Sequence, residues 1–265
     1  MSTTKNVNVT TGKVLHYTIS KEGYKTVNGS KLITADTTLN INMIPSTSSD
    51  GAYTFGDRIG GIATFFGYFD SVNPGTGDTQ KYACFVLDAQ YRDAKSLSSG
   101  DVSSYLPTYQ IGSTPDVALA SKESSTYNND AIFFNVSPSS SFAQAFYYAR
   151  NPGGQSLIIN VDGVNYQPLL PNVNELNQIY TYRTQLDAID PTLSSYSSKG
   201  LTSWSFGSTQ VPNGAWSSTY GGAFNAGGYT YYAWWCVTYT GDVAATSSDG
   251  TQTLGVVPVF EIPVS

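Results

Sequence analysis

The stretch SSTYGGAFNAGGYTYYAWWC, residues 217–236, combines closely spaced aromatic residues with glycine pairs and has no charged side chain. Its glycine-rich first part predicts a loop, and its aromatic end predicts a strand. In a strand, Trp235 and Val237 share one face, while Trp234 and Cys236 share the other. We expect one of these faces to belong to the core. The stretch therefore predicts a core strand that follows a loop with the potential to form a contact surface.

The uncharged region extends from Gly200 to Gly241 and contains all four tryptophans. Tyrosine and tryptophan suit binding surfaces, because they offer a large contact area at a low entropic cost. Ordinary packing within a loop is the alternative explanation for the same residues. The candidate ligand-binding residues are Trp216, Tyr220, Phe224, Asn225, Tyr229 and Tyr231.

The composition favours a β-rich protein with a real core. Hydrophobic residues make up 40% of the 265 residues and aromatic residues 14%, and tyrosine and phenylalanine prefer strands. Charged residues make up only 12%, about half the usual fraction of about 25%. The net charge of −6 argues against nucleic-acid binding, which needs a basic patch. No apolar stretch approaches the roughly 20 residues of a membrane span, so we expect no membrane insertion.

Two β-rich domains are predicted. Residues 1–45 alternate polar and apolar positions between glycines, residues 46–52 are rich in Ser and Thr, and residues 53–265 follow. The pattern GKVLHYTISKEGYKTVNG, followed by DTTLNINM, resembles small immunoglobulin-like or PEGA-like modules. The resemblance implies that residues 1–45 form a small immunoglobulin-like β-sandwich that serves as an anchor or spacer. Residues 46–52 would be the linker.

Within the second domain, the sequence predicts hairpins and two helices. Residues 58–70 and 81–92 read as paired strands, and Asp162-Gly163 marks the turn of another hairpin. Residues 94–130 are weakly patterned and predict long loops with short strands. The predicted helices cover residues 137–151 and 169–192. In the second helix, Asn172 and Glu175 have the spacing of a capping box, and Pro191 ends the pattern.

Several motifs of this domain resemble those of the C-type-lectin-fold family, which includes the formylglycine-generating enzymes. They are LPNVNELNQIYTYR at 170–183, SWSFGSTQ at 203–210 and a C-terminal segment that ends in VVPV at 256–259. The resemblance implies a C-type-lectin-like domain with two helices, and the overall class is mainly β, with α+β character in this domain. Two departures stand out: the family's C-terminal arginine is Val257 here, and only Cys236 lies where the enzymes bind copper through paired cysteines.

The sequence gives little support for enzymatic chemistry. Nucleophilic catalysis with a histidine base needs a histidine, and the only one, His16, lies in the first module. Cysteine and histidine are too few and too scattered for a typical zinc site. Candidate carboxylates such as Asp57, Asp88 and Glu175 have no evident reason to pair, and capping explains Glu175. We expect no catalytic residue, no metal and no cofactor.

The two cysteines, Cys84 and Cys236, each lie inside a strand-like run. Buried free thiols are the simpler explanation, and a disulfide is the alternative. Acidic turn residues such as Asp242 are interpreted as solvated, with weak calcium binding as the alternative.

The expected function is that of a non-enzymatic bacteriophage virion structural protein. The composition is typical of an adhesin or coat protein, yet the N-terminus shows no secretory signal. Virion proteins fit both observations, because they are made in the host cytoplasm and released by lysis. The expected partners are other virion proteins, further copies of the chain, and a host surface glycan or protein. A bacterial cell-surface or secreted adhesin is the alternative, and an enzyme of the formylglycine-generating kind is a weaker one.

Overall fold

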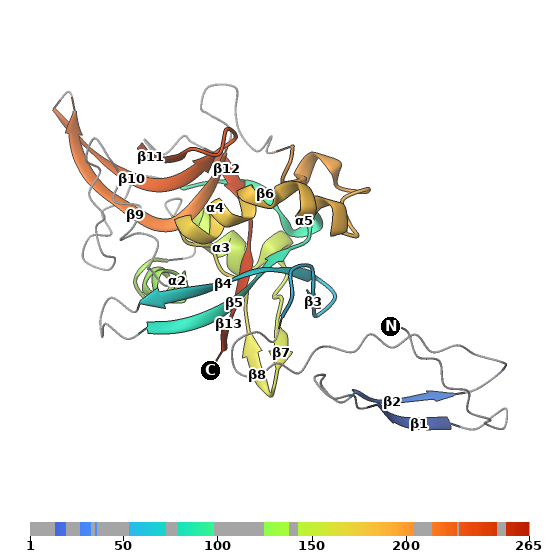
Figure 1. The fold of residues 1–265 in the computed structure, drawn as a ribbon. Coiled ribbons are helices and arrows are strands. Elements are labelled where there is room, and N and C mark those ends of the chain that lie inside the picture. The colour runs from blue at the N-terminus through green and yellow to red at the C-terminus, as the bar shows by residue number, and fades with distance from the viewer. Residues whose placement is uncertain are drawn as a thin grey trace. The chain divides into compact units, whose positions relative to one another are not determined.

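The structure, a computed structural model, describes residues 14–19, 27–32, 35, 53–72, 79–97, 125–137, 143–203, 214–226, 228–247 and 253–264 (Figure 1). Contacts within the chain divide it into two compact units, Met1–Tyr53 and Thr54–Ser265. None of the helices in the described ranges has the length and apolar character needed to cross a bilayer.

In the first unit, the described residues form an antiparallel pair of strands. Strand β1 (Val14–Ile19) pairs with β2 (Val27–Leu32), and His16 lies opposite Ser30. The predicted linker, residues 46–52, lies outside the described residues.

The described residues of the second unit form three sheets. The five-stranded sheet has the order β11 (Val243–Ser247), β10 (Tyr229–Thr238), β9 (Gly214–Ala226), β12 (Thr253–Val256) and β6 (Asp93–Ser96). The four-stranded sheet has the order β13 (Val259–Val264), β5 (Thr79–Leu87), β4 (Ala63–Val72) and β3 (Arg58–Ile59). Strands β7 (Ile159–Val161) and β8 (Val164–Tyr166) form a separate hairpin. All pairs are antiparallel except the short contact between β9 and β12.

Helices pack against these sheets, and α4 contacts strands of both the five-stranded and the four-stranded sheet. The α-helices in the described residues are α2 (Ser125–Asn135), α3 (Gln144–Arg150), α4 (Val173–Thr181) and α5 (Arg183–Ile189). Short 3-10 turns are η1 (Ala89–Tyr91), η3 (Pro152–Gly154) and η4 (Ser197–Lys199). The mainly β, α+β class predicted from the sequence is confirmed at this level.

The helix count differs from the prediction of two. The segment 137–151 yields the shorter α3, and α2 begins within the segment 94–130, where loops and strands were expected. The helix predicted over 169–192 is broken into α4 and α5 at Tyr182, whose backbone leaves helical values with φ −97° and ψ 10°. The Arg183 side chain donates to the Tyr180 carbonyl at 2.8 Å, which satisfies one acceptor at the end of α4.

The start of α4 confirms the predicted capping box. The Asn172 side chain accepts from the Glu175 backbone N–H at 2.9 Å, and the Glu175 carboxylate accepts from the Asn172 N–H at 3.0 Å. The hairpin turn at Asp162-Gly163 is also confirmed, with φ values of 52° and 85° that match a type I′ turn.

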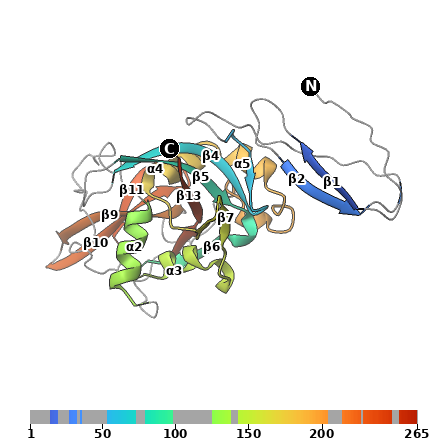
Figure 2. The same cartoon turned by 90° about the horizontal axis from the view of Figure 1, so that it is seen from below.

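The central feature of the unit is a sheet buried on both faces. On β10, Trp235 and Val237 face a core cluster that includes residues of β4, β5 and α4. Trp234 and Cys236 face a second cluster that includes residues of α2, α3 and β12. Figure 2 shows α2 and α3 on the side of β9 and β10 away from β4 and β5. The expectation of one core face is therefore too narrow, because both faces of this strand pack against apolar layers.

A polar segment of β9 joins this sheet to the helices. Ser217, Ser218 and Thr219 are completely buried. The Ser218 N–H donates to the Pro171 carbonyl at 2.7 Å, and the Thr219 hydroxyl accepts from the Val173 N–H at 3.0 Å. These bonds satisfy backbone groups just before and at the start of α4, so β9 fixes where that helix begins.

Candidate functional site

Strands β9 and β10 form a long hairpin that extends away from the body of the second unit (Figure 1). The strands are paired from Thr238 opposite Gly214 to Tyr229 opposite Ala226. The glycine-rich part of the quoted stretch was expected to be a loop, and this expectation is wrong. Backbone pairing continues through Gly222, which lies opposite Ala233, and the connection at the tip is short.

The six candidate ligand-binding residues all lie on this hairpin, but in different surroundings. Trp216 and Tyr220 are completely buried. The Trp216 indole N–H donates to the Lys95 carbonyl at 2.9 Å, and the Tyr220 ring packs at 5.4 Å from that of Trp234. Neither side chain is available at a surface, because each is part of the core that anchors the hairpin. For Phe224 and Tyr231 the structure describes the backbone in the strands and not the side chains.

Asn225 and Tyr229 are exposed near the tip. Tyr229 is 71% exposed. The Asn225 side-chain oxygen accepts from the Thr230 hydroxyl at 2.9 Å across the two strands, which holds the amide group in place. Together these residues present an aromatic ring, an amide and a hydroxyl without charge, a combination that suits contact with a polar, uncharged partner.

A second candidate site is an open cavity of about 550 Å³ beside β4 and α4. Its lining combines aromatic rings with two amides and one carboxylate, the mixture that ligand pockets commonly use. The lining residues are Phe55, Phe65, Phe66, Gly67, Tyr68, Phe69, Asp70, Asn174, Gln178 and Tyr182. The sequence gives no sign of this cavity, because its lining residues come from separate segments.

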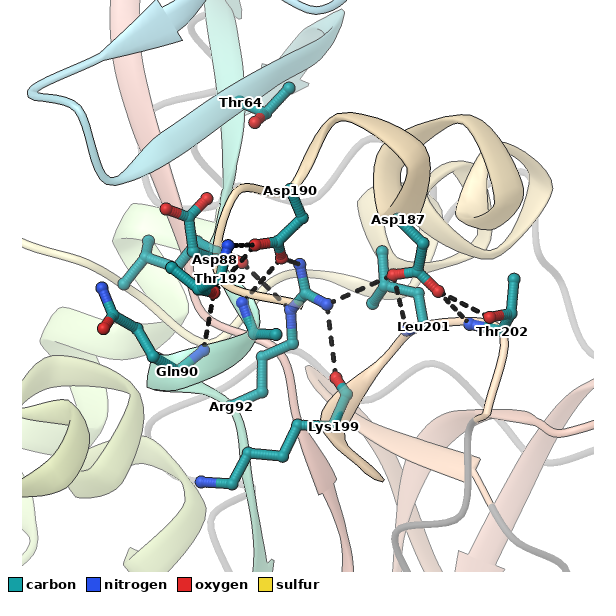
Figure 3. Close-up of polar contacts among 12 residues, drawn as sticks. Thr64, Asp88, Gln90, Arg92, Asp187, Asp190, Thr192, Lys199, Leu201 and Thr202 are labelled. Carbon is teal, nitrogen blue, oxygen red and sulfur yellow. Dashed lines mark hydrogen bonds and ion pairs between the residues drawn. The ribbon is translucent and has the colours of Figure 1, made fainter. Parts of the chain in front are cut away.

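Arg92 forms the centre of a buried ion-pair network (Figure 3). Its guanidinium lies 3.0 Å from an Asp190 oxygen and 3.5 Å from an Asp187 oxygen, and it donates to the Leu87 carbonyl at 3.0 Å. Burial lowers the pKa of Arg92, and the charges of Asp190 and Asp187 oppose that effect. The adjacent Asp88 pairs with Arg58, and burial nevertheless raises the pKa of Asp88.

Both aspartates of this network also hold backbone groups. Asp190 accepts from the N–H of Ala89 at 2.7 Å, and Asp187 accepts from the N–H groups of Leu201 and Thr202. The network therefore ties η1 to the segment that follows α5. Its side chains are enclosed, and this placement suits a structural task rather than contact with a substrate.

Cys84, Glu175 and Glu261 form another buried polar group, and the sequence gives no sign of it. The Cys84 thiol donates to Glu175 at 3.0 Å. Burial raises the pKa of Glu261 well above its usual range, and the neighbouring charge of Glu175 adds to the effect. Burial, together with both glutamates, likewise raises the pKa of Cys84. Without a bound cation, burial and the neighbouring carboxylate therefore favour the protonated form of Glu261.

The raised pKa of Glu261 predicts how the stability of the protein depends on pH in a buffer that contains a chelator. The folded-state pKa of Glu261 lies above the unfolded value of about 4.3, so its contribution is complete below that pH and is lost as the pH rises. The difference in unfolding free energy between the native chain and Glu261→Gln should shift by up to about 1.4 kcal/mol per pH unit in this window. Chemical denaturation at several pH values measures it. A difference that stays constant with pH would contradict the raised pKa of Glu261.

The two cysteines are free and buried, as expected. Cys84 belongs to the core cluster on one side of the central sheet, and Cys236 belongs to the cluster on the other side. Asp242 accepts from the Thr240 hydroxyl at 2.7 Å in an exposed turn.

Comparisons with models of known protein families, with curated proteins and with solved structures find no match for this chain. The fold and the candidate site define a β-rich α+β protein with an uncharged hairpin that exposes Tyr229 near its tip.

Proposed function

We propose that this protein is a non-enzymatic structural component of a bacteriophage virion, such as a capsid decoration, head-fibre or tail surface protein. In this role it presents its second unit to a protein or a glycan. The β9–β10 hairpin is the contact element. Other virion proteins and further copies of the chain are the proposed partners on the particle.

The observation that carries this proposal is the construction of the hairpin. Its base is held by Trp216 and Trp234, which are completely buried, and its tip exposes Tyr229. A rigidly anchored, exposed tyrosine contributes contact area without a large loss of side-chain entropy on binding. The absence of charge along the hairpin sequence favours an uncharged partner surface, and a glycan provides one.

The finer fold assignment is part of the same proposal. We assign the first unit to an immunoglobulin-like anchor or spacer and the second to a C-type-lectin-like domain. The pairing of the last strand, β13, with β5 supports the second assignment, because it joins the two ends of the unit in one sheet. The capping box at Asn172 also places a helix where the family-like motif lies.

A bacterial surface or secreted adhesin would use the same hairpin, so it is the main competing function. An enzyme of the formylglycine-generating kind is less well supported. Its copper site needs a cysteine pair, whereas Cys84 and Cys236 lie in core clusters on opposite sides of the central sheet.

Mass spectrometry of purified particles from the source culture tests the virion role, and electron microscopy then locates the protein. A stoichiometric copy number is the expected result. Recovery only from the cell envelope or the medium would replace the virion role with the adhesin role.

Replacing Tyr229 by alanine tests the contact element. We expect the full-length variant to lose about 2 kcal/mol of binding free energy, roughly thirtyfold in affinity, for a glycan or host protein that the native chain binds. The unfolding free energy should change by less than about 0.5 kcal/mol, because the side chain is exposed. A glycan array and titration calorimetry measure the binding.

The matched control is Tyr239→Ala. Tyr239 is also exposed, at 57%, but it follows β10 at the end away from the tip. Equal losses in both variants, or a loss in neither, would place the contact surface elsewhere.

A further inference from the structure

Three potential metal ligands meet inside the second unit, and each comes from a different element. Cys84 lies on β5, Glu175 in the first turn of α4, and Glu261 on β13. One ligand atom from each residue lies within 4.8 Å of the other two. Cys84 and Glu175 are completely buried, and Glu261 is 3% exposed.

One oxygen of each carboxylate is already held by donors from the surrounding chain. Glu175 Oε2 accepts from the Ser125 hydroxyl at 2.5 Å and from the Asn172 N–H at 3.0 Å. Glu261 Oε2 accepts from the N–H and the hydroxyl of Thr126. These donors fix the orientation of both carboxylates, which is the task that outer-shell hydrogen bonds perform around metal ions.

The other atoms of the three side chains remain for the centre of the cluster. Glu175 Oε1 accepts from the Cys84 thiol at 3.0 Å. Glu261 Oε1 is buried and has no hydrogen-bond partner among the described residues. The Glu175 carboxylate is its acidic neighbour, and two buried carboxylates in contact need a proton or a cation between them.

The charges around Cys84 and Glu261 also favour a bound cation. No basic side chain among the described residues acts on Cys84 or Glu261, and the interacting charges are all acidic. Two carboxylates that are both buried need at least one positive charge nearby. A single proton shared by the two glutamates can supply this positive charge, but it leaves the Cys84 thiol without a role in the cluster. A metal ion can bind all three side chains.

We propose that Cys84, Glu175 and Glu261 form a structural zinc site. A thiolate with two carboxylates suits Zn²⁺, which accepts sulfur and oxygen ligands at about 2.3 and 2.0–2.2 Å. Ligand atoms at those distances lie about 3.5 Å apart in a tetrahedron, so a small outward shift of Cys84 accommodates the ion. The second oxygen of one carboxylate, or a water molecule, supplies the fourth position.

Such an ion joins β5, α4 and β13 at one point. The ligands are deprotonated when they bind metal, so zinc replaces the shared proton of the glutamate pair and the proton of the thiol. Because the site is enclosed, the ion enters as the chain folds. The experiment therefore loads zinc during refolding.

The test compares the native full-length chain with Cys84→Ser and Glu261→Gln. Each protein is unfolded, refolded with Zn²⁺ or with EDTA, and desalted, and its zinc content is measured by mass spectrometry. Both variants keep a polar group of similar size, so folding can be checked by circular dichroism. Cys236→Ser is the matched control, since Cys236 is also buried but its pKa is raised by burial alone.

We expect one zinc per chain in the native protein and in Cys236→Ser, and at least about a tenfold lower content in the two ligand variants. Refolding with zinc should raise the unfolding temperature of the native chain by at least about 4 °C relative to refolding with EDTA. Substitution with Co²⁺ should give a thiolate charge-transfer absorption that Cys84→Ser lacks. A native chain that binds no more zinc than Cys84→Ser overturns the site and leaves the proton as the counter-charge.

Discussion

Replacing Arg92 by alanine is expected to lower the free energy of unfolding by about 3–5 kcal/mol. The side chain of Arg92 is 1% exposed and faces two aspartates whose side chains are 6% and 2% exposed. Removal of the cation leaves Asp187 and Asp190 buried without their counter-charge. The free-energy cost of losing the four polar contacts of the guanidinium is smaller than the cost of leaving two buried carboxylates without a counter-charge. The effect therefore comes mainly from the aspartates that remain.

Urea denaturation at neutral pH measures the effect. The control is Lys95→Ala, because Lys95 also pairs with an aspartate at 2.8 Å, but both partners are about one-third exposed or more. That exposed pair should contribute less than about 1 kcal/mol. Similar losses of unfolding free energy in the two variants would show that burial does not determine how much the Arg92 network contributes to stability.

Replacing Trp234 by alanine is expected to cost about 3–5 kcal/mol of unfolding free energy. Trp234 is completely buried on β10, and its ring lies 5.4 Å from the rings of Phe146 and Tyr220. Truncation leaves a cavity between α3 and the base of the hairpin, and the surrounding residues cannot fill it without moving a helix.

Trp234→Phe separates the contribution of the ring from that of the indole N–H. The Trp234 N–H has no hydrogen-bond partner among the described residues, so its removal should cost little. We expect a loss of less than about half of that caused by alanine. Thermal unfolding followed by circular dichroism measures both, and equal losses would rule out the cavity as the cause.

The sequence was sufficient for features that depend on neighbouring residues. Asn172 and Glu175 are three positions apart, and their capping box follows from that spacing alone. Asp162-Gly163 likewise predicts its own hairpin turn. The burial of Trp234 and Trp235 could be expected from their hydrophobic size within a strand.

The features that were missed depend on distant partners. The buried face of α2 contains Ser125, Asn128 and Asn129, so no apolar stripe marks this helix in the sequence. Its asparagines bond to backbone groups elsewhere: Asn128 donates to the Ser218 carbonyl, and Asn129 bonds to the N–H and carbonyl of Leu170. The sequence around α2 does not indicate that these distant backbone groups are its hydrogen-bond partners.

The candidate site was predicted only in part, for the same reason. Gly221 and Gly222 suggested a loop, but strand pairing with β10 overrides the weak strand preference of glycine. This pairing extends the hairpin and leaves Tyr229 near its tip, while Trp216 and Tyr220 lie in the core. Glu261 and Cys84 are far apart in the chain, and only the pairing of β13 with β5 places them opposite each other.

The position of β13 has a consequence for how the second unit is made. This strand comes last in the unit, pairs with β5 along its length, and adds a backbone bridge between Val259 and Leu169. Until the ribosome has synthesised residues 259–264, β5 remains an unpaired sheet edge. Its apolar side chains, which are buried in the folded unit, can then contact other chains. Native closure of this unit therefore cannot precede the synthesis of β13, and chaperones that shield sheet edges can act on β5 until then.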